Sequence, residues 1–237
     1  MCGILGLVNS KTIKRDTFLE ALNDLNHRGP DNTGYWQNEN RDIMFGHKRL
    51  AIIDLEHTGN QPMISKSNRY VIVYNGEIYN FLDIKNKLIQ EDFSNFSGTS
   101  DTEVLLNAIE KWGIEKTLTL LEGMFAFSVY DKKKDLIYLC RDRFGEKPLY
   151  YGKKNNFFFF TSELKPLKKI FSFNLNFCEK AVNLYFKFGY IPHPYSIFKD
   201  VYKLEPGNYL TFSINKNEVI TIKKYYELKN VFIDKEY

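Results

Sequence analysis

Short apolar runs and amphipathic stretches alternate along the chain, which predicts a mixture of strands and helices. The unbroken apolar run at residues 3–8 predicts a buried strand. Residues 16–26 predict a helix, because Phe18, Leu22 and Leu25 recur at helical spacing on one face. The same reasoning predicts short strands at 43–45, 51–53 and 70–74, and helices at 81–90 and 179–188.

The clearest helix signal begins at Ser100. Ser100 and Glu103 have the spacing of a capping box, in which each side chain accepts a hydrogen bond from the other residue's backbone N–H. Gly113 is a typical helix stop. Between these signals runs a single apolar stripe, made of Val104, Leu105, Ala108, Ile109 and Trp112.

Beyond Gly123 the pattern changes to short β-prone runs that are separated by Asp/Lys and Asn-Asn turns. It predicts a meander of antiparallel hairpins with strands at 124–130, 136–140, 148–152 and 157–161, and a closing strand pair at 209–214 and 218–226. Strand clusters interrupted by helices in this uneven order predict an α+β fold, with antiparallel sheets covered by helices.

Composition narrows the classes of protein. The net charge of +4 is spread over scattered lysines, without the dense basic stripe of a nucleic-acid partner. Three cysteines, an odd number without close pairing, argue against a disulfide framework and predict a reducing compartment. No apolar run reaches 18 residues and no signal segment is visible, so we expect a cytoplasmic protein with no membrane partner. The four histidines have no ligand spacing with the cysteines, so no metal site is predicted.

A cysteine stands second in the chain, and removal of Met1 would leave it at the N-terminus. The small side chains of Cys2 and Gly3 favour such removal. Cys2 would then carry both a thiol, with an ordinary pKa of about 8.5, and an α-amine with a pKa of about 7.7–8.0. The amine could accept the thiol proton without a histidine partner. By its position alone, Cys2 could equally be a small buried hydrophobic residue.

Polar segments downstream change that balance. They lie at 27–31 (His-Arg-Gly-Pro-Asp), 49–54 (Arg-Leu-Ala-Ile-Ile-Asp), 75–80 (Asn-Gly-Glu-Ile-Tyr-Asn) and 98–101 (Gly-Thr-Ser-Asp). Together with Met-Cys-Gly-Ile at the start, they resemble the class II, or N-terminal nucleophile, glutamine amidotransferases, and in particular the glutaminase domain of asparagine synthetases. Segments 123–127, 141–151, 162–165, 190–192 and 203–207 also look like that branch, and the resemblance extends to about residue 228.

The resemblance implies a fold and a set of roles. The fold would be the N-terminal nucleophile hydrolase sandwich, with four αββα layers and two antiparallel sheets between helices. Cys2 would attack the side-chain amide of glutamine and form a γ-glutamyl thioester. The Asn75 side chain and the Gly76 N–H would form the oxyanion hole, where glycine allows a close backbone approach and an unusual φ.

The remaining implied roles concern the binding of glutamine. Arg49 would grip the α-carboxylate, because its planar guanidinium can bind two oxygens at once. Glu77 and Asp101 would hold the α-ammonium group. Leu50, Ile52 and Ile53 would line the pocket and offer backbone contacts.

Each of these residues also has a simpler interpretation when it is taken alone. Arg49 could be a surface cation, Asn75-Gly76 could be a hairpin turn, and Asp101 could only favour its helix N-terminus. The order and spacing behind an N-terminal cysteine favour the active-site interpretation. For segment 27–31, a turn that shapes the site and a set of residues that contact substrate or guide ammonia stay equally open.

The resemblance also implies a division of the chain and of its chemistry. We expect a class II glutamine amidotransferase domain at 2–213, and at 214–237 closing strands and the start of a connection to a synthetase domain. The glutaminase half would need no cofactor. ATP and Mg would act only in the synthetase domain, whose Ser-Gly-Gly-x-Asp-Ser pyrophosphate loop does not occur in this sequence. The chain would therefore be a fragment, a truncated gene product or a stand-alone glutaminase.

The expected partners are glutamine and an ammonia-accepting synthetase domain or subunit, and a homodimer is compatible with the sequence. The full-length family converts aspartate, glutamine and ATP to asparagine, glutamate, AMP and pyrophosphate. Two other functions stay open. The chain could be the glutaminase half of a related amidotransferase with another acceptor, such as a surface-sugar precursor, or a non-catalytic glutamine-binding module.

Overall fold

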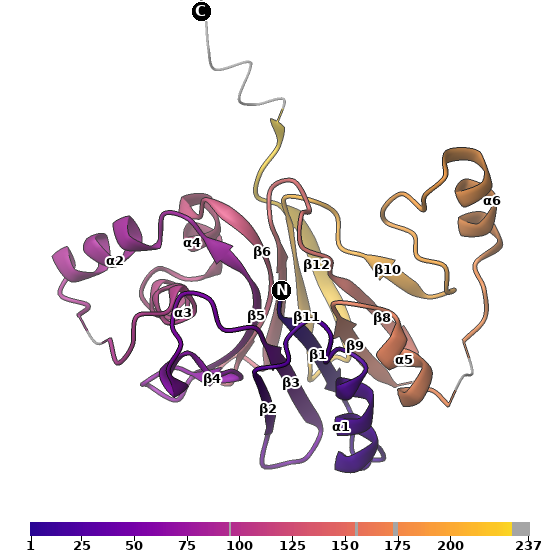
Figure 1. Cartoon of the computed structure of the whole chain (residues 1–237), viewed down its shortest axis with the longest axis horizontal. Helices are drawn as coiled ribbons and strands as arrows, with labels where there is room; N and C mark the ends of the chain where they lie inside the picture. The colour runs from indigo at the N-terminus through magenta and orange to yellow at the C-terminus, as the bar shows by residue number, and fades with distance from the viewer. Residues whose placement is uncertain (95, 155, 173–174, 229–237) are drawn as a thin grey trace, which may run out of the picture.

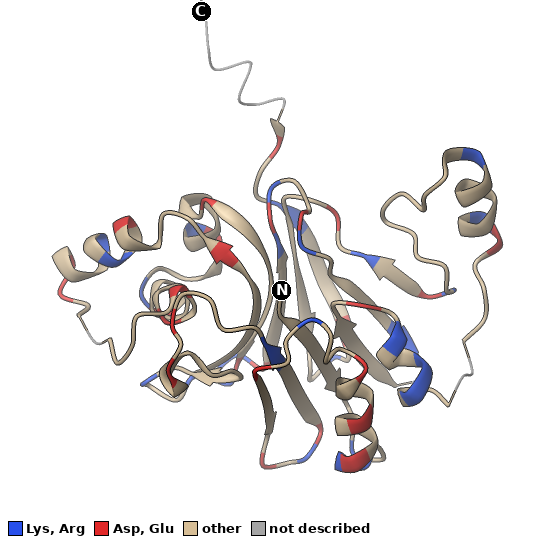
Figure 2. Cartoon of the chain, viewed as in Figure 1, with Lys and Arg blue, Asp and Glu red and all other residues tan. Residues whose placement is uncertain are grey.

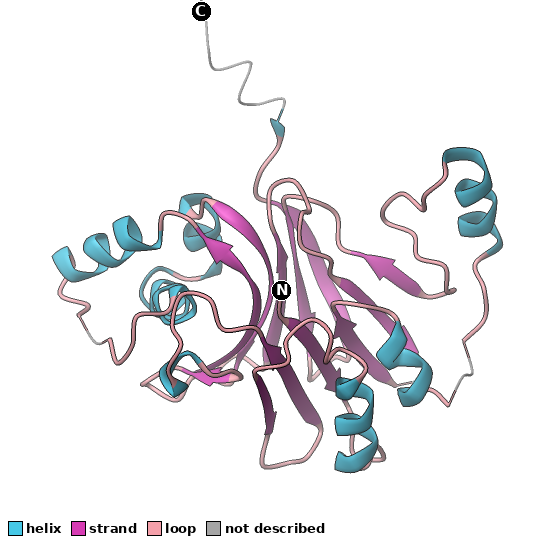
Figure 3. Cartoon of the chain, viewed as in Figure 1, coloured by secondary structure: helices cyan, strands magenta, loops and turns pink. Residues whose placement is uncertain are grey.

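Two six-stranded antiparallel sheets lie face to face, with helices on their outer sides (Figures 1 and 3). The computed structural model of the chain describes residues 1–94, 96–154, 156–172 and 175–228. The first sheet has the strand order β10-β8-β9-β1-β3-β2, and the second has the order β12-β11-β7-β6-β5-β4. Because the two sheets are built from different parts of the chain, residues far apart in the sequence meet between them.

The elements have the following bounds. The first sheet consists of β1 (Gly3–Val8), β2 (Asn32–Gln37), β3 (Ile43–Arg49), β8 (Tyr150–Lys154), β9 (Phe157–Thr161) and β10 (Val201–Lys203). The second consists of β4 (Met63–Ile64), β5 (Tyr70–Ile78), β6 (Gly123–Asp131), β7 (Leu136–Arg141), β11 (Asn208–Ser213) and β12 (Glu218–Lys224). The helices are α1 (Arg15–Asn23), the 3-10 helix η1 (His57–Gly59), α2 (Phe81–Gln90), α3 (Asp101–Trp112), α4 (Ile114–Leu120), α5 (Lys165–Ile170) and α6 (Glu179–Phe188).

Strand periodicity sorts the side chains into three apolar layers. Alternate residues of a strand point to opposite faces of its sheet. Ile4 and Val8 of β1 therefore pack with Val71 and Val73 of β5 between the sheets. The outer face of the first sheet packs against α1 and α5, and that of the second packs against α2, α3 and α4. This αββα layering confirms the predicted fold class.

Most predicted elements are present, and helices 81–90 and 179–188 have the predicted bounds. The predicted strand at 148–152 is shifted to 150–154. The predicted strand at 51–53 is wrong. The chain leaves the sheet after Arg49, and the Ala51 N–H donates to the Asp31 carboxylate at 2.9 Å instead of to a strand.

The helix predicted at 16–26 ends earlier, at Asn23. The next backbone N–H groups, those of Asp24, Leu25 and Asn26, donate to carbonyls three residues back, so the chain tightens into turns. Strand β3, predicted only at 43–45, runs on through Lys48 and Arg49, which are buried despite their charge. The pattern gave no indication of β2, β4, β10, α4 or α5, because these elements are short or begin with polar residues.

Only half of the predicted capping box is present at the N-terminus of α3. Ser100 Oγ accepts from the Glu103 N–H at 3.2 Å, as expected. The Glu103 carboxylate does not return the bond to Ser100. It accepts from the N–H groups of Ser97 and Gly98, at 2.7 and 2.8 Å. The reciprocal capping box is therefore wrong, and Glu103 instead fixes the loop that leads into α3.

Charged residues of both signs are interspersed over the elements (Figure 2). In the part of the chain that the structure describes, no helix is long and apolar enough to cross a bilayer.

Candidate active site

Cys2 lies directly before β1, and strand alternation assigns it to the side of Ile4 and Val8, between the two sheets. Strand β1 pairs with β3 in a register that sets Gly3 opposite Lys48 and Ile4 opposite His47. Extending this register by one residue brings Cys2 beside Arg49. The thiol sulfur Sγ accepts a hydrogen bond from the Leu50 N–H at 3.4 Å.

A pocket opens at this end of the sandwich, and all the site residues predicted from the sequence line it. They are Cys2, Arg49, Leu50, Ile52, Ile53, Asn75, Gly76, Glu77 and Asp101. The start of β1, the end of β3 and the loop after β3 supply Cys2, Arg49, Leu50, Ile52 and Ile53, whereas β5 and α3 supply the others. The site therefore forms only when the two sheets pack together.

Arg49 is buried and is not the surface cation that its residue type alone would suggest. Its Nη1 donates to the Glu56 carbonyl at 2.7 Å and to Asn60 Oδ1 at 2.9 Å, and its Nη2 donates to the Asp54 carbonyl. A guanidinium has five N–H donors, so these three bonds leave two for a ligand. The loop that follows β3 thus holds a cation in place at the pocket wall.

The Asp54 carboxylate helps to fix the conformation of the same loop. Its carboxylate accepts from the Glu56 and Thr99 N–H groups at 2.9 and 3.1 Å and from the Thr58 hydroxyl at 3.0 Å. These hydrogen bonds lower the pKa of Asp54 in spite of its burial, and the Arg49 charge lowers it further. The loop after Arg49 and the loop before α3 are therefore joined through one carboxylate.

On either side of its pairing with β4, the outer edge of β5 donates backbone hydrogen bonds to side chains. Backbone N–H groups of alternate residues point to this edge, away from β6. Those of Tyr70, Tyr74 and Ile78 donate to Ser65 Oγ, Gln61 Oε1 and Asp101 Oδ2 at 3.0, 2.6 and 3.0 Å. The Gly76 N–H belongs to the same edge, beyond the short strand β4, which pairs only with Val71 and Ile72. Gly76 lines the pocket, so this geometry leaves its N–H as a backbone donor on the pocket side.

The side chain of Asn75 lies next to this donor on the face between the sheets. It is buried, and neither Nδ2 nor Oδ1 has a hydrogen-bond partner in the described chain. A buried amide without a partner is uncommon and costs about 1–3 kcal/mol. Asn75-Gly76 is part of β5, so the hairpin-turn interpretation is wrong.

The expected unusual φ of Gly76 is also wrong, since Gly76 is not among the glycines with positive φ. The reason for glycine here is space. A Cβ atom on Gly76 would lie 2.4 Å from the Met124 carbonyl oxygen and 2.7 Å from the Phe125 Cα. Any larger residue would push β5 away from β6, and the Gly76 N–H would move with it.

Asp101 is buried at the first turn of α3 and faces β5. Its Oδ2 accepts from the Tyr74 hydroxyl at 2.6 Å and from the Ile78 N–H at 3.0 Å. Burial raises the pKa of Asp101, these hydrogen bonds oppose the rise, and the neighbouring charge of Glu77 adds to it. The carboxylates of Asp101 and Glu77 thus both line the pocket, and no cation among the described residues is bonded to either, an arrangement suited to an ammonium ligand.

The thiol of Cys2 is not activated while Met1 is attached. Burial raises the pKa of Cys2, and the hydrogen bond from Leu50 only partly opposes this. Burial lowers the pKa of the Met1 α-amine, and the nearby cations Arg28 and Lys147 lower it further, against the effect of Cys2. The α-amine of Cys2 itself is part of a peptide bond in this form.

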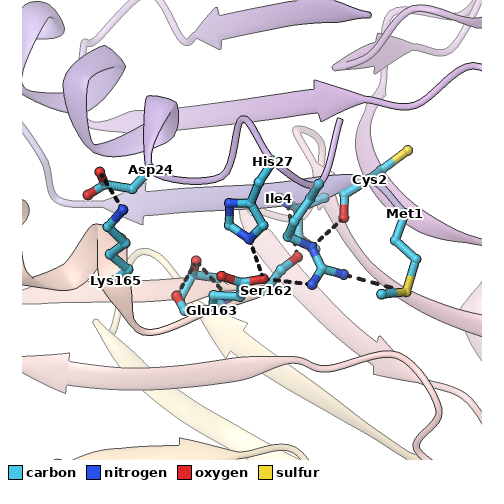
Figure 4. A network of polar contacts seen from close by, with 10 residues as sticks. Met1, Cys2, Ile4, Asp24, His27, Ser162, Glu163 and Lys165 are labelled. Atoms are coloured by element: carbon cyan, nitrogen blue, oxygen red, sulfur yellow. Dashed lines mark hydrogen bonds and ion pairs between the residues drawn. The ribbon is translucent and has the colours of Figure 1, made fainter. Parts of the chain in front are cut away.

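Segment 27–31 contacts the backbone of Cys2 and the side chain of Glu163 (Figure 4). Arg28 Nε donates to the Cys2 carbonyl at 2.9 Å, and Arg28 Nη1 pairs with Glu163 at 2.8 Å. His27 reaches the same Glu163 oxygen at 3.0 Å. Among the described residues the segment does not line the pocket. Of the two interpretations left open for it, these contacts favour a turn that shapes the site.

Sequence reasoning assigned no role to several residues of the site. Tyr74, Gln61 and Lys147 line the pocket, and Asp54 and Glu163 orient its walls. Asp54 and Lys147 lie inside segments that resemble the family, which was a usable signal. Tyr74 looks like any apolar strand residue, and only its contacts reveal it. No group of three or more metal-binding side chains occurs among the described residues.

The fold and the site together define a protein of the amidotransferase kind, with a cysteine in the pocket at the N-terminal end of the first strand. A family model described as a glutamine amidotransferase domain matches residues 1–226, and the chain belongs to this family. Its sandwich is the N-terminal nucleophile hydrolase fold.

Among curated proteins, the chain is 41% identical to a putative glutamine-hydrolysing asparagine synthetase 2 of Methanocaldococcus jannaschii, over 95% of this chain and 46% of the relative. It is 36% identical to asparagine synthetase 1 of Bacillus subtilis, over 96% of this chain and 35% of the relative. The chain therefore spans less than half the length of these relatives.

Among solved structures, the chain is similar to the glutamine phosphoribosylpyrophosphate amidotransferase of B. subtilis complexed with ADP and GMP. The TM-score is 0.71 at 18% identity, over 95% of this chain and 49% of that chain. This similarity supports the fold.

Proposed function

We propose that this chain hydrolyses glutamine to glutamate and ammonia through a γ-glutamyl thioester on Cys2. It would act as the ammonia-supplying half of an ATP-dependent asparagine synthetase. The observation that carries the proposal is the meeting of the unpartnered Asn75 amide, the edge N–H of Gly76 and a cysteine sulfur in one pocket. A hydrolase needs such donors for the oxyanion of its tetrahedral intermediate.

Substrate binding would use the two ends of the pocket. The free N–H donors of Arg49 would bind the α-carboxylate of glutamine. Asp101 and Glu77 would hold its α-ammonium group, while Leu50, Ile52 and Ile53 line the space between. The side-chain amide of glutamine would then lie at Cys2, with its carbonyl oxygen towards Asn75 and Gly76.

The chemistry follows from removal of Met1, which frees the α-amine of Cys2. The amine takes the thiol proton as Sγ attacks the amide carbon, and the resulting oxyanion is held by Asn75 and Gly76. Collapse of this intermediate breaks the C–N bond, and the amine delivers the proton to the departing nitrogen, so ammonia leaves. Water then attacks the thioester in the same way and releases glutamate and the thiol.

The fate of ammonia indicates the partner. Near neutral pH, ammonia in bulk water is mostly protonated and is a poor nucleophile, so a separate glutaminase would waste it. The length of the relatives and their names support an ATP-dependent synthetase domain or subunit as the acceptor. We propose that ATP and Mg act there and that the glutaminase step needs no cofactor.

The test combines intact mass with turnover. The purified chain is incubated with a diazo ketone analogue of glutamine, and its mass is measured before and after, together with glutamate release from glutamine. We expect loss of Met1, a single label on Cys2, glutamate formation, and no asparagine from aspartate and ATP. Retained Met1 with no turnover would contradict the proposal and favour a glutamine-binding module. Asparagine formation by this chain alone would refute the division of labour.

A further inference from the structure

His47 lies in β3, two residues before Arg49, the residue that the strand register sets beside Cys2. It is fully buried, stands opposite Ile4 of β1, and shares the inner face of its sheet with Ile43, Phe45 and Arg49. It therefore points across the sandwich to the second sheet, two residues before Arg49 along the strand.

His47 makes a hydrogen bond that crosses from the first sheet to the second. Its Nε2 lies 3.0 Å from the carbonyl oxygen of Tyr74 in β5. Among the described strand residues, no other hydrogen bond joins a residue of the first sheet to one of the second. Elsewhere along the two strands, Ile4 and Val8 of β1 meet Val71 and Val73 of β5 through apolar contacts.

The protonation of His47 is fixed by its surroundings. Burial, with a smaller contribution from the charge of Arg49, lowers the pKa of His47 to about 4, against the opposing effect of the hydrogen bond to Tyr74. The imidazole is therefore neutral at neutral pH and has one N–H. Because a carbonyl can only accept, that N–H is on Nε2, and the buried Nδ1 is left without a partner in the described chain.

An apolar residue would fill this position without leaving a buried nitrogen unpaired, so what His47 adds is the hydrogen bond. The Tyr74 carbonyl belongs to the peptide unit that joins Tyr74 to Asn75. The other edge group of Tyr74, its N–H, is held by Gln61 at 2.6 Å. Fixing both groups fixes the rotation of β5 immediately before Asn75 and Gly76.

We propose that His47 is a positioning residue that aligns the oxyanion donors of β5 with the Cys2 sulfur across the gap between the two sheets. The inference rests on the proposed hydrolysis of glutamine. Its effect falls on the chemical step, because the oxyanion exists only in the transition state and the intermediate. Glutamine binding depends mainly on Arg49, which is held by its own loop.

The test compares His47→Leu with His47→Gln in the full chain after Met1 removal, because the glutamine side chain keeps an N–H donor that can reach a carbonyl. We expect His47→Leu to lower kcat for glutamine hydrolysis about tenfold to a hundredfold, with KM within about threefold. His47→Gln should recover kcat to within about fivefold of the original. The exposed His193, changed to Leu and to Gln, is the matched control and should leave both constants unchanged.

Thermal unfolding is measured for every variant, so that loss of structure is recognised. Equal kcat in His47→Leu and the original chain would overturn the inference, as would a rise in KM with unchanged kcat. Folded Leu and Gln variants with the same reduced kcat would also overturn it, since shape rather than the hydrogen bond would then matter. No turnover by the unsubstituted chain, by contrast, would refute the proposed hydrolysis itself.

Discussion

The hydroxyl of Tyr74 donates to Asp101 Oδ2 over 2.6 Å, which ties β5, directly before Asn75 and Gly76, to the first turn of α3. Both groups are buried, and burial raises the pKa of both side chains. The hydrogen bond therefore orients a carboxylate whose charged form is destabilised by burial. Such a cost is common where a charge serves binding more than stability.

Asp101→Asn should separate these two roles. We expect KM for glutamine to rise about tenfold or more, because the neutral amide cannot pair with an ammonium group. The free energy of unfolding at pH 7 should rise, since a carboxyl whose folded-state pKa is raised destabilises the fold where it is charged. Steady-state kinetics and denaturant titration measure the two effects.

The pH dependence checks the sign of this prediction. The gain in stability of the variant should be largest above the raised pKa of Asp101. It should shrink as the pH falls towards the ordinary pKa, because the carboxyl of the original chain is then protonated in both states. A variant that is destabilised at pH 7 with KM unchanged would show that Asp101 only supports the start of α3.

Asn75→Ala should impair catalysis without a matching loss of stability. Removal of one oxyanion donor typically lowers kcat about a hundredfold to a thousandfold. The side chain makes no hydrogen bond in the described chain, so its loss removes an unpaired buried amide and should change the free energy of unfolding by only about 1 kcal/mol. Glutamate release and thermal unfolding are the measurements. A large loss of stability with kcat retained would assign Asn75 to the core.

Arg49→Lys tests the carboxylate site. A lysine amine cannot reproduce the fork that reaches three loop oxygens and still offers two donors, so KM should rise at least about tenfold. We expect kcat to fall less, because the binding of the carboxylate is shared by substrate and transition state. Arg41→Lys, in an exposed turn, is the matched control and should behave like the original chain.

Cys2→Ala should reduce glutamine hydrolysis to background and abolish labelling by the diazo ketone analogue, while the unfolding midpoint stays within a few degrees. The control is Cys178→Ala, at the start of α6 and outside the pocket, which should keep full activity. A Cys2 variant with measurable turnover would require another nucleophile and would remove the proposed mechanism.

His47 should make the fold sensitive to acid. The pKa of His47 is about 4 in the folded chain against an ordinary value of 6.5. The unfolded chain therefore takes up a proton first, and stability is lost as the pH falls from about 6.5 towards 4. Between pH 7 and pH 4 this amounts to roughly 3 kcal/mol at 1.36 kcal/mol per pKa unit. His47→Gln should unfold with a correspondingly flatter pH dependence in denaturant titrations, and an unchanged slope would contradict the assignment.

Local patterns predicted those parts of the fold that depend on neighbouring residues. The spacing of apolar residues set α2, α6 and the stripe of α3, and the Ser100 cap was visible in four residues. The pattern failed where tertiary contacts override it. Lys48 and Arg49 lie beyond the strand predicted at 43–45 but complete β3. Asn23, Asn26 and Thr33 hold the lysine amine, and the loop oxygens hold the guanidinium.

The sequence by itself determined the residue types of the site, the α+β class and, through its resemblance to a family, which residues should meet. Only the tertiary structure decided how they meet. It showed that position 76 needs glycine because β6 approaches it closely, and that the following loop holds the Arg49 guanidinium. It also showed that the Glu103 carboxylate accepts hydrogen bonds from a loop and not from the Ser100 N–H. The physical reason is that hydrogen-bond partners and close approaches are set by packing between the two sheets, which brings together residues that no local pattern connects.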